Sequence, residues 1–91
     1  KMARFICIHH APGLGQEEFL ANAPRVVEAK YAKMERCFVN LASGLIVQIC
    51  EADSAEAVEK EFERLGFPFD EIHELQLEAT YELLAQLVHG K

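Results

Sequence analysis

The order of the apolar segments along the chain is the feature that most restricts its fold. Residues 3–10 are rich in β-branched and aromatic side chains, and two similar runs at 34–41 and 45–51 flank a short turn that contains glycine. Residues 71–78 form a last alternating run. Segments with apolar residues at intervals of three and four lie between these runs, as is typical of amphipathic helices. The order strand, helix, hairpin, helix, strand predicts a split β-α-β domain.

Local signals predict where the helices begin and end. Gly15 can open the first helix, and Pro24 should kink or restart it because proline removes an internal hydrogen bond. Asp53 has the spacing of a capping box for the second helix, and Gly66 ends that helix. Thr80 can cap a last helix, whose apolar face is broad enough to need cover from the body or from a second subunit.

With right-handed crossovers, these segments predict one α+β domain over residues 2–91. The domain would be a ferredoxin-like β-α-β-β-α-β sandwich with an additional C-terminal helix. Its antiparallel sheet would have the spatial strand order 4-1-3-2. Both crossover helices would then cover one face of the sheet and leave the other face open.

Composition narrows the kinds of partner that we expect. The net charge is −6, from nine basic and fifteen acidic residues, so nucleic-acid binding is not expected. No apolar run approaches the ~20 residues that a membrane span needs. Three cysteines form no disulfide framework, which favours a reducing cytoplasm. The hydrophobic fraction of 51% is high for a chain of 91 residues, which favours burial of apolar surface against a partner.

The open face of the sheet is where the sequence predicts a functional site. Because Ile6 and Ile8 are expected to face the helices, Cys7 and His9 should point to the open face. A thiolate and an imidazole two residues apart, near the carboxylate of Glu74, could bind a borderline transition metal. The alternative is that Cys7 is a small buried residue and that His9 lies in an interface.

A second interpretation is a dimeric α+β-barrel enzyme that acts on a small organic molecule. Paired sheets would enclose a pocket lined by Phe5, His9, Arg36, Phe38 and Asn40. His9 would serve as general acid or base, since histidine titrates near neutral pH. A third interpretation is an interaction module that binds no ligand.

Two segments in the second half of the chain are similar to a known family. Residues 50–58 read Cys-Glu-Ala-Asp-Ser-Ala-Glu-Ala-Val, and residues 65–75 read Leu-Gly-Phe-Pro-Phe-Asp-Glu-Ile-His-Glu-Leu. They resemble part of a family of small bacterial proteins, formerly a domain of unknown function, that is now described by a nickel-binding member. The stretch Gly-x-Pro-x-Asp-Glu-Ile-x-Glu is the most specific part, and the likeness runs from about Phe5 to Leu77.

The resemblance implies a ferredoxin-like fold, a homodimer and nickel as a ligand. His9 matches the histidine at the end of the family's first strand. Phe62 stands where the nickel-binding pattern often has a histidine. Cys7 stands where that pattern has an acid, and a thiolate ligand would favour a softer ion. We therefore expect a small cytoplasmic protein that binds nickel or another divalent transition metal on the open sheet face of a homodimer. The ligands would be His9, with Cys7 and Glu74 as helpers.

Overall fold

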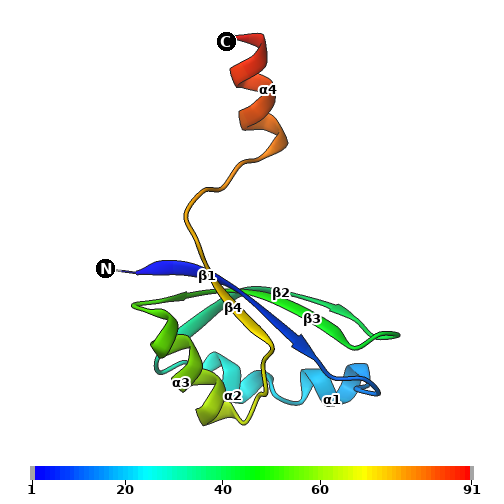
Figure 1. Cartoon of the computed structure of the whole chain (residues 1–91). Helices are drawn as coiled ribbons and strands as arrows, with labels where there is room; N and C mark the ends of the chain where they lie inside the picture. The colour runs from blue at the N-terminus through cyan, green and yellow to red at the C-terminus, as the bar shows by residue number, and fades with distance from the viewer. Residues whose placement is uncertain (1, 91) are drawn as a thin grey trace.

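A computed structural model describes residues 2–90 of the chain as a four-stranded antiparallel sheet with helices (Figure 1). This arrangement confirms the predicted α+β class. In chain order, the elements are β1 (Ala3–His10), α1 (Gln16–Leu20), α2 (Ala23–Val27), β2 (Ala32–Asn40), β3 (Leu45–Ala52), α3 (Ala55–Leu65), β4 (Glu71–Leu75) and α4 (Tyr81–His89). Within residues 2–90, no helix is both long and apolar enough to cross a membrane.

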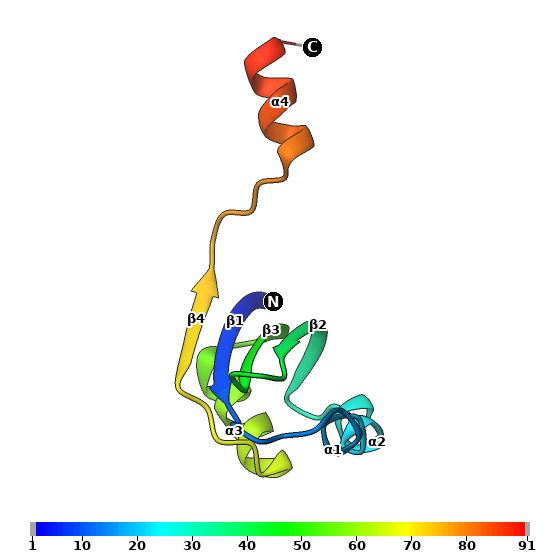
Figure 2. The ribbon, with the colours of Figure 1, turned by 90° about the vertical axis from the view of Figure 1, so that its right-hand side faces the viewer.

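The strands lie in the order β2-β3-β1-β4, and all neighbours are antiparallel. Read from the β4 edge, this is the order 4-1-3-2. Helices α1, α2 and α3 lie on one side of the sheet, whereas α4 stands apart at the end of an extended segment (Figures 1 and 2). Among the described residues, the opposite face of the sheet therefore has no helix on it.

Several element ends differ from the prediction for local reasons. The cap of α3 is Ser54 and not Asp53, because the Ser54 hydroxyl accepts a hydrogen bond from the Ala57 backbone N–H at 3.1 Å. Gly66 ends α3 in the left-handed conformation, with φ +74°, as predicted. Pro24 lies in the first turn of α2, where its missing N–H costs nothing, so the helix restarts and does not kink. The last strand of the sheet is shorter than predicted and ends at Leu75.

The two faces of the sheet are the reverse of the prediction. Phe5, Cys7 and His9 point toward the helices, where Cys7 is 0% exposed and His9 is 4% exposed. Ile6 and Ile8 lie on the open face and are only half-buried. The predicted metal and barrel-pocket residues on β1 are therefore in the interior between sheet and helices, and not on the open face.

Packing against α3 explains which row of β1 faces inward. The inward row of the sheet contains small side chains at Cys7, Cys50 and Ala52, which allow the helix to approach closely. Phe62 of α3 fills the space above them and is 2% exposed. Ile6 belongs to the opposite row and is equally apolar, so alternation alone does not distinguish the two faces.

The β2–β3 hairpin packs tightly on the loop that follows β1. Gly44 has φ +81°, and a Cβ atom at this position would lie 2.5 Å from the Pro12 backbone nitrogen. The Ala11 backbone N–H donates a hydrogen bond to the Gly44 carbonyl at 2.8 Å. Only glycine combines this backbone conformation with this close approach.

Glu61 ties α3 to the segment between α2 and β2. Its carboxylate is 4% exposed and accepts hydrogen bonds from the backbone N–H groups of Lys30, at 3.2 Å, and Tyr31, at 2.9 Å. The Arg64 guanidinium donates to the second carboxylate oxygen at 2.6 Å. Burial acts to raise the pKa of Glu61, but these hydrogen bonds and the nearby positive charge outweigh it, so that the pKa lies below its usual value.

Candidate functional site

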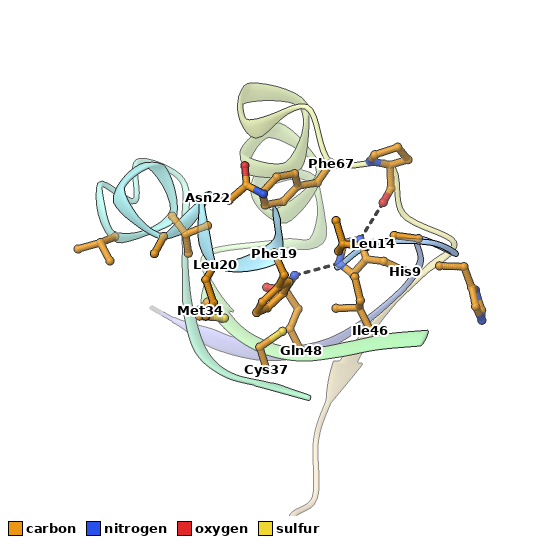
Figure 3. Close-up of a pocket in the computed structure, with 16 residues that line it drawn as sticks. His9, Leu14, Phe19, Leu20, Asn22, Met34, Cys37, Ile46, Gln48 and Phe67 are labelled. Atoms are coloured by element: carbon orange, nitrogen blue, oxygen red, sulfur yellow. Dashed lines mark hydrogen bonds between the residues drawn. The ribbon is translucent and has the colours of Figure 1, made fainter. Parts of the chain in front are cut away.

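A pocket lies between the helix-facing side of the sheet and the α1–α2 pair (Figure 3). Its volume is about 380 Å³, within the range of small-molecule sites. The walls are mostly apolar and come from the β1–α1 loop, both short helices, β2, β3 and the segment after α3: Leu14, Phe19, Leu20, Ala23, Val26, Val27, Met34, Ile46, Phe67 and Pro68. The pocket exists because α1 and α2 are separate short helices that leave part of the sheet uncovered.

The floor of the pocket is a chain of hydrogen bonds centred on His9 and Gln48 (Figure 3). Nδ1 of His9 lies 2.8 Å from the Pro68 carbonyl oxygen, which can only accept, so Nδ1 carries the proton. Nε2 of His9 then accepts a hydrogen bond from the Gln48 side-chain amide at 2.9 Å. The Gln48 oxygen accepts from the Cys50 thiol at 3.1 Å. This arrangement defines the tautomer of the His9 ring, with Nδ1 as the donor and Nε2 as the acceptor.

His9 is also held by aromatic packing. Its ring meets Phe62 edge to face, with 4.8 Å between the ring centroids and an interplanar angle of 75°. His9 is thus a core histidine with both ring nitrogens hydrogen-bonded, and it forms part of the pocket floor. The alternative from the sequence had placed it in an interface. Sequence reasoning missed the role of Gln48. The available signal was its place in an inward row of β3 between two apolar residues, Ile46 and Cys50.

The electrostatic character of the pocket is close to neutral. Among the described residues that line it, none is Lys, Arg, Asp or Glu. Burial raises the pKa of the Cys37 thiol, so this group is protonated at neutral pH. His10 is one of the lining residues, and its Nδ1 lies 2.5 Å from a carboxylate oxygen of Asp70. Asp70 itself does not line the pocket.

The predicted metal ligands His9, Cys7 and Glu74 are not brought to one point. Cys7 lies in the core opposite Gln48, whereas Glu74 is exposed and pairs with Phe5. Both ring nitrogens of His9 already have hydrogen-bond partners. In residues 2–90, no group of three or more His, Cys, Asp and Glu side chains is placed to hold a metal ion. The three side chains do not fit a shared ion in this arrangement, and nickel binding stays a prediction.

The set predicted for a barrel pocket is divided by the sheet. Phe5 and His9 lie on the helix side. Arg36 and Phe38 pair with Ile49 and Val47, which lie on the open face. The fifth residue, Asn40, accepts a hydrogen bond from a backbone N–H of its own hairpin turn at 2.9 Å. These five residues therefore cannot line one cavity in a single chain.

The fold and the pocket define a small α+β protein with a ligand-sized cavity under a four-stranded antiparallel sheet. No known family model and no curated protein matches the chain. Among solved structures, the chain is similar to SCO4226 from Streptomyces coelicolor A3(2), with a TM-score of 0.76 and 31% sequence identity. The similarity covers 85% of this chain and 100% of the Streptomyces chain. The chain therefore belongs to the same family as SCO4226.

Proposed function

We propose that this protein binds a small, uncharged and largely apolar organic molecule in the pocket between the sheet and α1–α2. The observation that carries the proposal is the combination of a cavity of about 380 Å³, a lining without Lys, Arg, Asp or Glu and a hydrogen-bonded polar floor. Specific small-molecule sites have this composition, because apolar walls supply affinity and a few fixed polar groups orient the ligand.

The floor offers the ligand one oriented polar contact. The Gln48 amide nitrogen uses one of its two N–H groups on His9, so the other can donate to a carbonyl or hydroxyl oxygen of the ligand. The Cys37 thiol in the wall is neutral and adds a polarizable surface. A charged ligand would leave its charge unpaired in this environment, at a large desolvation cost.

The geometry favours binding over acid–base catalysis by His9. A general base must have a free nitrogen within reach of the substrate proton. Nε2 of His9 is committed to Gln48, and Nδ1 is committed to Pro68. Catalysis by His9 would first require one of these two hydrogen bonds to break.

We also propose that the domain is ferredoxin-like. The strand order and the position of α1, α2 and α3 on one side of the sheet support this assignment (Figure 1). A cytoplasmic location and nickel as a ligand stay predictions from the sequence. The pocket proposal depends on none of them.

Fluorescence titration with N-phenyl-1-naphthylamine, a neutral apolar probe, tests the binding proposal. Ala23 lines the pocket, and Ala21 is an exposed alanine nearby that does not. We expect saturable binding that Ala23→Phe weakens by at least about tenfold, whereas Ala21→Phe changes it less than about twofold. Circular dichroism establishes that both variants are folded.

Nuclear magnetic resonance locates the bound probe. We expect the side-chain amide signals of Gln48 to shift during the titration, because this group forms the pocket floor. No saturable binding by the wild type would refute the proposal. Equal weakening of probe binding by Ala23→Phe and Ala21→Phe, or signal shifts confined to residues outside the pocket, would also refute it.

A further inference from the structure

The inward row of β3 carries a single amide group among apolar side chains. Gln48 is 8% exposed and lies between Ile46 and Cys50 on this row. Its partners on the neighbouring strands are Cys7 of β1 and Cys37 of β2, and both have small side chains. The longer glutamine side chain therefore extends past them into the cavity, where Figure 3 shows it next to His9.

Hydrogen bonds fix the orientation of the Gln48 amide at both of its polar atoms. The oxygen accepts from the Cys50 thiol at 3.1 Å, and the nitrogen donates to Nε2 of His9 at 2.9 Å. Nε2 is an acceptor because Nδ1 of the same ring donates to the Pro68 carbonyl. A reversed amide would place its oxygen against this acceptor, so the tautomer of His9 determines which way the amide points.

The amide nitrogen of Gln48 has a second N–H group that the ligand must satisfy. Within residues 2–90, no side chain or carbonyl accepts a hydrogen bond from this second N–H. The amide oxygen already has one partner, the Cys50 thiol. A buried N–H without an acceptor costs more than a carbonyl oxygen that lacks its second donor. A ligand that displaces water from the floor therefore has to bring an acceptor to Gln48.

The other polar residues of the lining do not compete for this role. His9 and Gln48 are the buried polar side chains among them, and both ring nitrogens of His9 are occupied. Asn22 and Cys37 are half-buried and His10 is exposed, so water can reach the first and last of these groups when a ligand is bound. The Cys37 thiol is only a weak donor. Gln48 is therefore the group that selects the ligand.

We propose that the pocket selects neutral apolar molecules that carry a hydrogen-bond acceptor oxygen, as a ketone does, and that this oxygen binds the second N–H of Gln48. His9 is the positioning residue that keeps the donor side of the amide available. This inference rests on the binding function proposed above and adds the polar group that the ligand must carry. A hydrocarbon, or a molecule whose polar group only donates, would leave the N–H of Gln48 unpaired.

A ketone and a hydrocarbon of the same shape distinguish this selection from simple apolar binding. The probe 2-acetylnaphthalene has a carbonyl oxygen where 2-isopropenylnaphthalene has a methylene group, and the two molecules are otherwise alike. A cavity without a hydrogen-bond donor favours the hydrocarbon, because the carbonyl loses its hydrogen bonds to water on binding. A preference for the ketone therefore reports a hydrogen bond from the protein.

Nuclear magnetic resonance titration of isotope-labelled protein with each probe measures this preference. We expect the wild type to bind the ketone at least about fivefold more tightly than the hydrocarbon. Gln48→Met has a similar shape but no N–H, and it should invert the order, so that the hydrocarbon binds more tightly. Ala23→Phe is the control, since it narrows the cavity and should weaken both probes while their affinity ratio stays within about twofold.

The same spectra test the contact and the role of His9 in the wild type, whether or not Gln48→Met folds. The ketone should shift one of the two side-chain amide protons of Gln48 downfield, and the hydrocarbon should not. The ring nitrogen signals of His9 should show a protonated Nδ1 and an unprotonated Nε2.

Each outcome separates this inference from the binding function on which it rests. If both probes bind and the hydrocarbon binds equally well or better, the selection by Gln48 is wrong, whereas the pocket remains a binding site. A ketone preference that persists in Gln48→Met would also overturn the inference, and a protonated Nε2 would overturn the role of His9. If neither probe binds in the pocket, the selection and the binding function both fail.

Discussion

Replacing Glu61 with glutamine should destabilise the domain strongly, although the two side chains have nearly the same shape. The amide oxygen of the new side chain could still accept from the backbone N–H groups of Lys30 and Tyr31. The amide nitrogen would then take the place of the oxygen that accepts from Arg64 at 2.6 Å. A donor would face a donor in a position that is almost fully buried.

The size of the effect follows from the bonds that change. A hydrogen bond between charged groups contributes about 1.5–3 kcal/mol to stability. The short bond from Arg64 Nη2 to Glu61 Oε2 would be lost, whereas the longer one from Nε to Oε1, at 3.4 Å, would keep its acceptor. The guanidinium keeps its bonds to the carbonyls of Arg25 and Glu28, at 3.3 and 3.2 Å, so it is not left unpaired. We expect a loss of about 2–3 kcal/mol in the free energy of unfolding at pH 7. For a domain of this size, that loss lowers Tm by roughly 10–20 °C.

The loss should depend on pH in a defined direction. Burial acts to raise the pKa of Glu61, but the hydrogen bonds from Arg64 and from the backbone lower it by a larger amount. The folded-state pKa therefore lies below the unfolded value of about 4.3. The stabilisation by Glu61 is fully present above the unfolded pKa, and it disappears as the pH falls through the folded-state pKa. The difference between wild type and Glu61→Gln should therefore shrink in acid.

Urea unfolding followed by circular dichroism measures this difference at pH 7 and at about pH 3. Glu59→Gln is the matched control, because Glu59 is an exposed glutamate on the same helix. The reasoning is refuted if Glu61→Gln and Glu59→Gln unfold within about 0.5 kcal/mol of each other at pH 7. It is also refuted if the difference between wild type and Glu61→Gln persists undiminished in acid.

Two further predictions concern a turn and the metal hypothesis. Gly44→Ala should lower the free energy of unfolding by at least about 2 kcal/mol, because left-handed backbone strain adds to a clash with the loop after β1. Gly13→Ala should lower it by only about 1 kcal/mol, because Gly13 has φ +85° but no atom within 4 Å of the new Cβ. Thermal unfolding measures both losses. Equal losses at the two glycines would contradict the clash. Titration calorimetry with nickel tests the metal prediction from the sequence. Because both ring nitrogens of His9 are hydrogen-bonded and Cys7 is buried away from Glu74, we expect Cys7→Ala/His9→Ala to leave any nickel binding unchanged; binding that the double variant abolishes would contradict this expectation.

Much of the backbone arrangement follows from short-range signals in the sequence. The strand at 3–10, the glycine that ends α3 and the threonine cap of α4 were all predicted, because each depends on neighbouring residues. The sheet faces were predicted wrongly. Both rows of β1 are apolar, and the inward row is chosen by how closely α3 can approach Cys7, which is a property of the packed fold.

The candidate site was harder to predict, because its parts are distant in the sequence. His9 was recognised as important, but its partners Gln48 and Pro68 lie 39 and 59 residues away. The cavity itself depends on the break between α1 and α2, which the sequence predicted only as a kink or restart at Pro24. A pocket formed by a gap between helices leaves no periodic pattern in the chain.

The hydrogen-bonded floor of the pocket has a consequence for how this protein can diversify. The Pro68 carbonyl and the side chains of His9, Gln48 and Cys50 form a directed chain, in which each side chain donates to the group before it. Replacement of the His9, Gln48 or Cys50 side chain leaves a buried partner unmatched, so viable changes among these three must come in linked pairs. The apolar walls carry no such constraint, since hydrophobic residues of similar volume exchange at low cost. Relatives could thus evolve new ligand preferences through the walls while the floor stays fixed.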